Sequence, residues 1–252
     1  METALTQTAE IPISRVEFSG PDAEKFLQGQ LSNDIAAMIP GAAASMLAGF
    51  HSPQGRVIAL LELRRPARDE FCAQMPTDIV ELVTTRLRRF VLRSKLQISN
   101  PAPAAAPAAS GSRAARIAAG LPQVYAATTE LFVAQMLNLD VIGAISFTKG
   151  CYTGQEIIAR AHYRGRVKRR MQRFLSTTQC ALQPGENHRL LDGRSAQVVD
   201  ACQHADGRCE FLAVTTLPGG AAPEAVDNAI LQSGTTPLLP CAALELPYLL
   251  PE

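Results

Sequence analysis

The stretch Lys149-Gly150-Cys151-Tyr152-Thr153-Gly154-Gln155-Glu156 places a thiol between a lysine and a predicted helix start. Thr153 and Glu156 have the spacing of a capping box, in which each side chain bonds the backbone N–H of the other residue. Tyr152 before the cap and Ile157 after it are placed to form a hydrophobic staple. The pattern therefore predicts a helix whose N-cap is Thr153.

Cys151 is predicted to lie just outside this helix. The positive end of the helix and the ammonium of Lys149 both favour a thiolate over a thiol. Cys151 is then the candidate nucleophile and Lys149 its electrostatic partner. The alternative interpretation is a strand-to-helix turn in which the cysteine is a small packing residue.

The composition indicates a globular protein of one or two domains. The chain has 252 residues, of which 47% are hydrophobic, enough for a buried core. No apolar run approaches the ~20 residues that span a bilayer, and the first 15 residues lack the basic and apolar regions of a signal peptide. We expect a cytoplasmic protein without a membrane partner.

The cysteines and histidines show no metal-ligand spacing. The six cysteines form no CxxC pair, and the four histidines form no HExxH motif. We therefore expect reduced thiols and no metal bound by the chain itself.

Seven cations and no carboxylate occur between Arg160 and Arg173. Residues 164, 166, 168 and 170 alternate, so in an extended chain they would share one face as a basic stripe. Such a stripe attracts phosphates or carboxylates. A solvated edge strand whose charges prevent aggregation explains the same residues.

The order of predicted elements divides the chain into four parts. Residues 1–99 alternate strands and helices, with strands over 11–18 and 71–75, a hairpin over 43–63, a helix that starts within 19–22 and another over 78–92, which favours an α+β domain. Residues 100–115 are rich in Pro and Ala and are predicted to be a linker. Residues 116–165 complete the α+β part. Residues 166–252 contain short β runs separated by Gly, Asp and Pro, typical of a small barrel or sandwich.

A polar segment, residues 28–35 (QGQLSNDI), follows the first predicted helix. It is too polar for a core and suits a loop that lines a cleft or a solvated turn. Gln30 and Asn33 are its candidate ligand-binding side chains.

KGCYTGQE, continued as IIARAHYRGRVKRR, resembles the signature of the YgfZ family of folate-binding proteins. EKFLQGQLSND, GRVIALLEL, RLRRFVLRSKLQIS, the approach MLNLD to SFTKG and the closing ELPY support this resemblance across most of the chain. The family is similar in fold to the aminomethyltransferase of the glycine cleavage system. The resemblance implies ferredoxin-like antiparallel sheets with helices, plus a C-terminal β-barrel, around a folate cavity.

The resemblance also implies a function and a site. Members of the family act in iron–sulfur cluster assembly or repair and, through a cluster-dependent enzyme, in tRNA thiolation. Tetrahydrofolate or a derivative is the implied cofactor, and iron–sulfur proteins or their assembly factors are the implied partners. The residues implied to line the cavity are Lys149, Cys151, Tyr152, Gln155 and Glu156, with Cys151 the functional thiol.

Folate chemistry suggests further assignments. The flat pterin needs amide or carboxylate partners, and the glutamate tail needs cations. The candidates for the pterin are Gln30, Asn33, Gln155 and Glu156, and those for the tail are Arg160, Arg164 and Arg166.

Three alternatives stay open. The first is a folate-dependent aminomethyltransferase, although no carboxylate could be assigned to activate the amine. The second is a module that uses the basic stripe to bind RNA, such as tRNA, or an acidic protein. The third is a paralogue that no longer closes around folate, because the 100–115 segment stands where longer family members carry much of a second ferredoxin-like part. The chain also lacks tryptophan, so Ile13 and Ser112 occupy places where relatives can stack an indole on folate.

Overall fold

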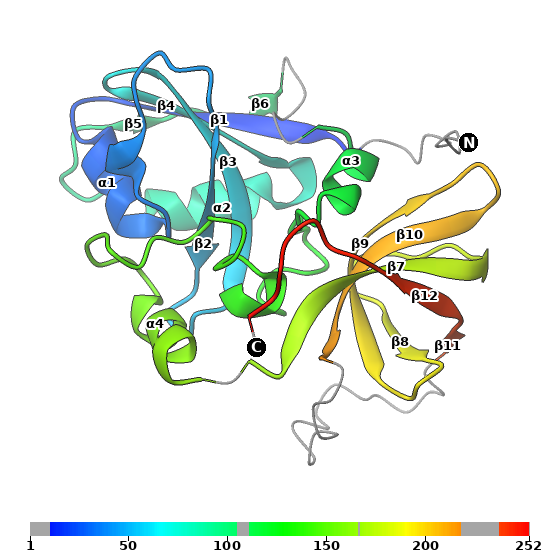
Figure 1. Ribbon diagram of the computed structural model, residues 1–252. Helices are drawn as coiled ribbons and strands as arrows, with labels where there is room; N and C mark the ends of the chain where they lie inside the picture. The colour runs from blue at the N-terminus through cyan, green and yellow to red at the C-terminus, as the bar shows by residue number, and fades with distance from the viewer. Residues whose placement is uncertain (1–10, 105–110, 166, 218–236, 252) are drawn as a thin grey trace.

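An antiparallel sheet forms the N-terminal part of the computed structural model, which describes residues 11–104, 111–165, 167–217 and 237–251. Its strands follow the order β2-β3-β4-β1-β5, and β6 also pairs with β1 (Figure 1). Their bounds are β1 Ile13–Ser19, β2 Met46–His51, β3 Val57–Ala67, β4 Glu70–Pro76, β5 Gln97–Ile98 and β6 Ala102–Pro103. The predicted α+β class is therefore confirmed for this part.

Burial follows the strand patterns. β1 alternates, burying Val16 and Phe18, as expected for a strand with one face on the core. The first seven residues of β3, Val57 to Leu63, are all buried, so both faces of this strand are covered. β3, which lies between β2 and β4, is therefore buried on both faces within the sheet.

Two helices pack on this sheet. α1 (Ala23–Gln30) buries Ala23, Phe26 and Leu27 and contacts β4. α2 (Thr77–Arg88) follows Pro76 and contacts β1, β3 and β4 through buried residues at helical spacing: Ile79, Val80, Val83, Thr84 and Leu87. An acid in its first turn and arginines in its last complement the helix dipole.

α2 ends earlier than the sequence predicts. The apolar pattern continues to Leu92, but Phe90 is half-exposed and Leu92 is almost fully exposed. The chain instead turns and leads to β5, which pairs with Phe18 and Ser19 of β1. Pairing of this distant strand, rather than helix periodicity, determines the path after Arg88.

Both ends of the 100–115 segment have regular structure. Ala102 and Pro103 form β6, which pairs with Ser14 and Arg15. α3 (Arg113–Ala118) is capped by Ser112, whose Oγ accepts a bond from Ala115 N at 3.3 Å. Residues 105–110 lie outside the described residues, so the predicted division of the chain at this segment stays a prediction.

The second sheet is a nearly closed barrel, which confirms the predicted C-terminal β-barrel. Its order is β11-β8-β9-β10-β7-β12, and its strands are β7 Arg169–Gln179, β8 Asn187–Leu190, β9 Ser195–Gln203, β10 Arg208–Thr216, β11 Leu238–Leu239 and β12 Cys241–Leu244. β11 and β12 are separated by Pro240 alone, yet they pair with the opposite edges β8 and β7. The chain itself therefore closes the sheet. Of the short β runs that the sequence predicts for residues 166–252, the one at 228–231 lies outside the described residues.

β10 is buried on both faces, because it separates two cores. Cys209, Phe211 and Ala213 face the barrel interior, whereas Leu212 and Val214 belong to the larger core shared with the N-terminal sheet. This alternation has the period of two expected of a strand. The two halves of the chain thus pack together through β10, and Met171 of β7 and Val199 and Cys202 of β9 belong to the same shared core.

A buried polar network adds to this contact. Asp200 of β9 is fully buried and accepts hydrogen bonds from Arg113 Nε of α3 at 2.7 Å and Tyr125 OH at 2.8 Å. The C-terminal segment also returns to the N-terminal part (Figure 1), where Tyr248 OH donates to Gly120 O at 2.7 Å.

The predicted basic stripe is wrong. Arg164 ends a helix, α4 (Gln155–Arg164), instead of starting a strand. Arg170 is buried and binds Asp140 through both guanidinium nitrogens, at 2.9 and 3.0 Å. Arg166 lies outside the described residues. None of the described helices is long and apolar enough to cross a membrane.

We expect Asp200→Asn to lower the free energy of unfolding by about 3 kcal/mol, because it leaves the largely buried Arg113 without its counter-ion. Urea denaturation measures this change. Asp192→Asn, which removes a partly exposed carboxylate paired with Arg194, is the control and should cost less than about 1 kcal/mol. Equal losses in the two variants would show that the buried network does not join the two halves.

Candidate functional site

The Lys149 ammonium organises the region around the cysteine motif. Its Nζ donates to the backbone carbonyls of Gln28 at 2.7 Å, Leu31 at 2.6 Å and Asn33 at 2.7 Å. An ammonium has three N–H donors, so these contacts use all of them. Since the carbonyls lie at and beyond the C-terminal end of α1, the cation also opposes the negative end of that helix. Lys149 therefore fixes the polar 28–33 segment.

Burial lowers the pKa of Lys149 to about 8, and the negative charge of Asp34 opposes this shift. The Tyr152 ring centroid lies 5.2 Å from Nζ, in cation–π range. Within the described part of the chain, no hydrogen bond joins Lys149 to Cys151. The sequence predicts Lys149 as a partner of the thiol, whereas its observed contacts are with backbone and an aromatic ring.

The predicted capping box is wrong. α4 begins at Gln155, its N-cap is Gly154, and no side chain caps it. The Gln155 side chain instead reaches back, where its Oε1 accepts a bond from Tyr152 N at 3.4 Å. Thr153 therefore lies outside the helix, and Ile157, predicted to form the staple, is partly exposed.

Gly154 explains the shift of the helix start. Its φ is +83°, which favours glycine, and an added Cβ would lie 2.5 Å from Ser52 O and 3.2 Å from Gly55 Cα. The motif thus passes directly over the turn between β2 and β3. If Thr153 were the N-cap, residue 154 would need the negative φ of a helix. The close contact with the turn holds Gly154 at a positive φ instead.

His51 lies beneath the motif at the end of β2. It is buried, its ring centroid is 6.3 Å from that of Tyr152, and neither ring nitrogen has a hydrogen-bond partner among the described residues. Burial lowers its pKa to about 3, so this histidine is neutral at physiological pH. It occupies the space above Gly49, where an added Cβ would lie 2.3 Å from Nε2.

Cys151 is exposed. All six cysteines lie in the described residues, and the other five are buried or partly buried. Burial raises the pKa of Cys202 and Cys209 to about 12 and that of Cys241 to about 11. Exposure therefore distinguishes Cys151 from the other five thiols.

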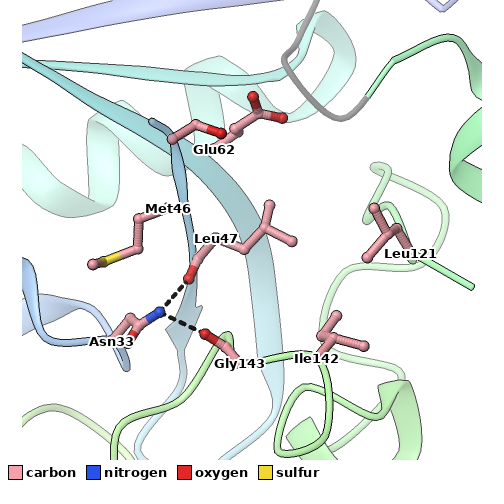
Figure 2. A pocket seen from close by; sticks show the side chains of 8 residues that line it. Asn33, Met46, Leu47, Glu62, Leu121, Ile142 and Gly143 are labelled. Atoms are coloured by element: carbon pink, nitrogen blue, oxygen red, sulfur yellow. Dashed lines mark hydrogen bonds between the residues drawn. The ribbon is translucent and has the colours of Figure 1, made fainter. Parts of the chain in front are cut away.

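The 28–34 segment connects the motif to a cavity. Asn33 Nδ2 donates to Leu47 O at 2.8 Å and to Gly143 O at 2.7 Å (Figure 2), and its Oδ1 accepts from Asp34 N at 2.9 Å. Both amide N–H bonds of Asn33 are thus used within the protein. Its contribution is to join β2 to the loop that carries Gly143.

An open cavity of about 520 Å³ lies beside this junction. Its walls combine apolar and polar side chains, and Glu62 of β3, which is 4% exposed, contributes a carboxylate. Arg116 of α3 lies 3.8 Å from that carboxylate. The lining residues are Asn33, Ser45, Met46, Leu47, Glu62, Leu121, Ile142 and Gly143 (Figure 2).

The structure gathers some of the predicted site residues and separates others. Lys149, Tyr152 and Gln155 lie together around the turn above His51. Of the predicted residues, Asn33 lines the cavity. Gln30 ends α1 with a buried side-chain oxygen that has no described partner. Glu156, Arg160 and Arg164 are exposed on α4, and Arg166 lies outside the described residues.

Sequence reasoning missed Glu62. The available signal was a single carboxylate in the otherwise apolar run VIALLEL, which forms the buried β3. A charge at such a position is rarely buried without a partner or a role.

Two relatives share the sequence pattern over most of their length. The tRNA-modifying protein YgfZ of Edwardsiella ictaluri is 26% identical, covering 88% of each chain, and that of Klebsiella pneumoniae is 28% identical, covering 75% of this chain and 79% of its own. The chain belongs to the YgfZ family. An uncharacterized protein of Haemophilus influenzae is 32% identical, covering 65% of this chain and 71% of its own.

The fold of this YgfZ-family chain is aminomethyltransferase-like. The glycine cleavage system aminomethyltransferase T of Bartonella henselae superposes with a TM-score of 0.63 over 82% of this chain and 77% of its own, at 14% identity. At that identity, the likeness shows the fold alone. No protein-family model matches the chain.

Gly154→Ala should destabilise this YgfZ-family protein by at least about 1 kcal/mol, because alanine disfavours the positive φ and meets the Ser52 carbonyl. Gly150→Ala is the matched control, since an added Cβ there meets no atom within 4 Å. Urea denaturation of both variants measures the difference. If Gly154→Ala were no less stable than Gly150→Ala, the described contact between the motif and the β2–β3 turn would be wrong.

Cys151 should react with iodoacetamide faster than any other cysteine at neutral pH, because it is exposed and the other thiols are shielded. Timed alkylation followed by peptide mass spectrometry measures each rate. We expect Cys202 and Cys209 to react slowest in the folded protein. Faster labelling of Cys241 than of Cys151 would contradict this assignment.

Proposed function

We propose that this protein binds tetrahydrofolate or a derivative in the cavity beside Glu62, and that it supports iron–sulfur cluster assembly or repair. tRNA modification would depend on it indirectly, through a cluster-dependent enzyme. Cys151 is the proposed functional thiol. The observation that carries the proposal is the buried Glu62 carboxylate at an open cavity in an aminomethyltransferase-like fold.

The cavity fits the chemistry of a pterin. Its volume lies within the range of about 300–1,000 Å³ typical of small-molecule sites. A pterin presents neighbouring N–H donors on one edge, which a carboxylate accepts in a bidentate manner. Leu47, Leu121 and Ile142 provide apolar surface for its flat faces.

Each residue near the cavity has a defined task in this proposal. Glu62 accepts the pterin N–H groups, and the Arg116 guanidinium lies 3.8 Å from its carboxylate. Asn33 holds the wall between β2 and residue 143, and Lys149 holds the segment that carries Asn33. Bound tetrahydrofolate would supply one-carbon carrier chemistry.

Support for the cellular role comes from the relatives, which are named tRNA-modifying proteins. The iron–sulfur role rests on the family resemblance, as does the assignment of the thiol. Cytoplasmic residence is proposed on the same basis. It agrees with the six cysteines, none of which forms a disulfide bond in the described residues.

Glu62→Gln should weaken tetrahydrofolate binding by about tenfold or more, since a hydrogen bond to a charged group contributes about 1.5–3 kcal/mol. Isothermal titration calorimetry measures the affinity. Glu81→Gln, which neutralises an exposed carboxylate on α2, is the control and should bind like the wild type.

The unfolding midpoint of Glu62→Gln is measured in parallel, so that loss of binding is not confused with loss of folding. Absence of saturable binding by the wild type would refute folate binding by this chain. Unchanged affinity in Glu62→Gln would show that folate binds without this carboxylate.

A further inference from the structure

α4 presents an exposed face that the cavity does not use. The face consists of Arg160, Tyr163 and Arg164, which fall on one side of the helix at a spacing of three and four residues. All three are exposed, and none of them lines the cavity. Within the described part of the chain, neither guanidinium takes part in an ion pair or a hydrogen bond.

Tyr163 is held in place although it is largely exposed. Its ring meets the His162 ring edge-on, with centroids 4.8 Å apart and an 80° angle, and the Phe147 ring at 6.1 Å and 70°. Phe147 in turn stacks on His162 at 3.8 Å and 16°, and packs against the main core. The core therefore supports Tyr163 through two other rings, while 68% of its surface stays open to solvent.

A solvated helix face explains exposed arginines, but it does not explain a fixed and open aromatic ring between them. An exposed ring that is already ordered loses little conformational entropy when a flat group stacks on it. Cations beside the ring attract an anionic backbone. Bases stacked on aromatic rings, with arginines along the phosphates, are how proteins bind single-stranded nucleic acid.

We propose that the face formed by Arg160, Tyr163 and Arg164 binds single-stranded RNA, with one base stacked on Tyr163 and phosphates held by the two arginines. The site is separate from the proposed folate cavity, so it stands or fails independently of folate binding. It lies in the second half of α4, the helix that begins four residues after Cys151.

The test is fluorescence anisotropy with a fluorescein-labelled, single-stranded RNA oligonucleotide containing all four bases, measured without folate. Tyr163→Ala should weaken binding by at least about fivefold, because stacking contributes roughly 1–3 kcal/mol per base. Tyr163→Phe keeps the ring and should bind within about twofold of the wild type.

The arginines are tested by salt dependence. Arg160→Ala/Arg164→Ala should reduce the slope of log affinity against log salt by about 1.4, since each phosphate contact on a single strand contributes about 0.7. The control is Arg89→Ala/Arg93→Ala, which removes the same charge from exposed arginines beyond the end of α2.

Three results would overturn the proposal. The first is absence of saturable RNA binding by the wild type. The second is equal weakening by the control pair, which would mean that net charge alone attracts RNA. The third is equally tight binding of poly-glutamate that Tyr163→Ala leaves unchanged, which would assign the face to an acidic protein. Circular dichroism of each variant verifies that α4 and the fold are retained.

Discussion

One ammonium group determines the geometry of the candidate site. Lys149 holds three backbone carbonyls at and after the end of α1, and this fixes the segment that supplies Asn33. Asn33 in turn joins β2 to the loop at residue 143 and forms one wall of the cavity. A lysine from the motif thus holds a wall of the pocket through Asn33, which lies 116 positions earlier in the chain.

This arrangement connects the thiol and the cavity without placing them together. Lys149 is two residues from Cys151, while its ammonium lies beneath the cavity wall. The motif is also pressed onto the β2–β3 turn through Gly154, so its position follows that of the N-terminal sheet. A change that moves the turn or the 28–33 segment would therefore also shift the backbone on either side of Cys151. Lys149 and Gly154 of the motif therefore position backbone, one at the end of α1 and the other over the β2–β3 turn.

Much of the fold could be predicted from the sequence, because the strands and α2 carry clear periodicity and the resemblance covers most of the chain. The aminomethyltransferase-like fold and the C-terminal barrel are confirmed. The errors arose where tertiary contacts outweigh local pattern. Thr153 and Glu156 have capping-box spacing, yet the turn beneath Gly154 decides where the helix begins. The alternating cations at 164, 166, 168 and 170 suggested an exposed basic stripe. Arg170 is instead buried against Asp140, a partner that the local pattern could not reveal. Glu62 was visible as one charge in an apolar strand, and only the structure places it at a cavity.

The closure of the barrel has a consequence for the order of events during synthesis. The strands of the N-terminal sheet are complete once residue 103 has been made, so that sheet can pair early. The edges of β7 and β8, by contrast, gain their partners only when residues 238–244 emerge. Until then the nascent chain carries two unpaired strand edges, which are sites for mispairing with other chains. The strands at residues 238–244 therefore cover both of these edges at the end of barrel assembly.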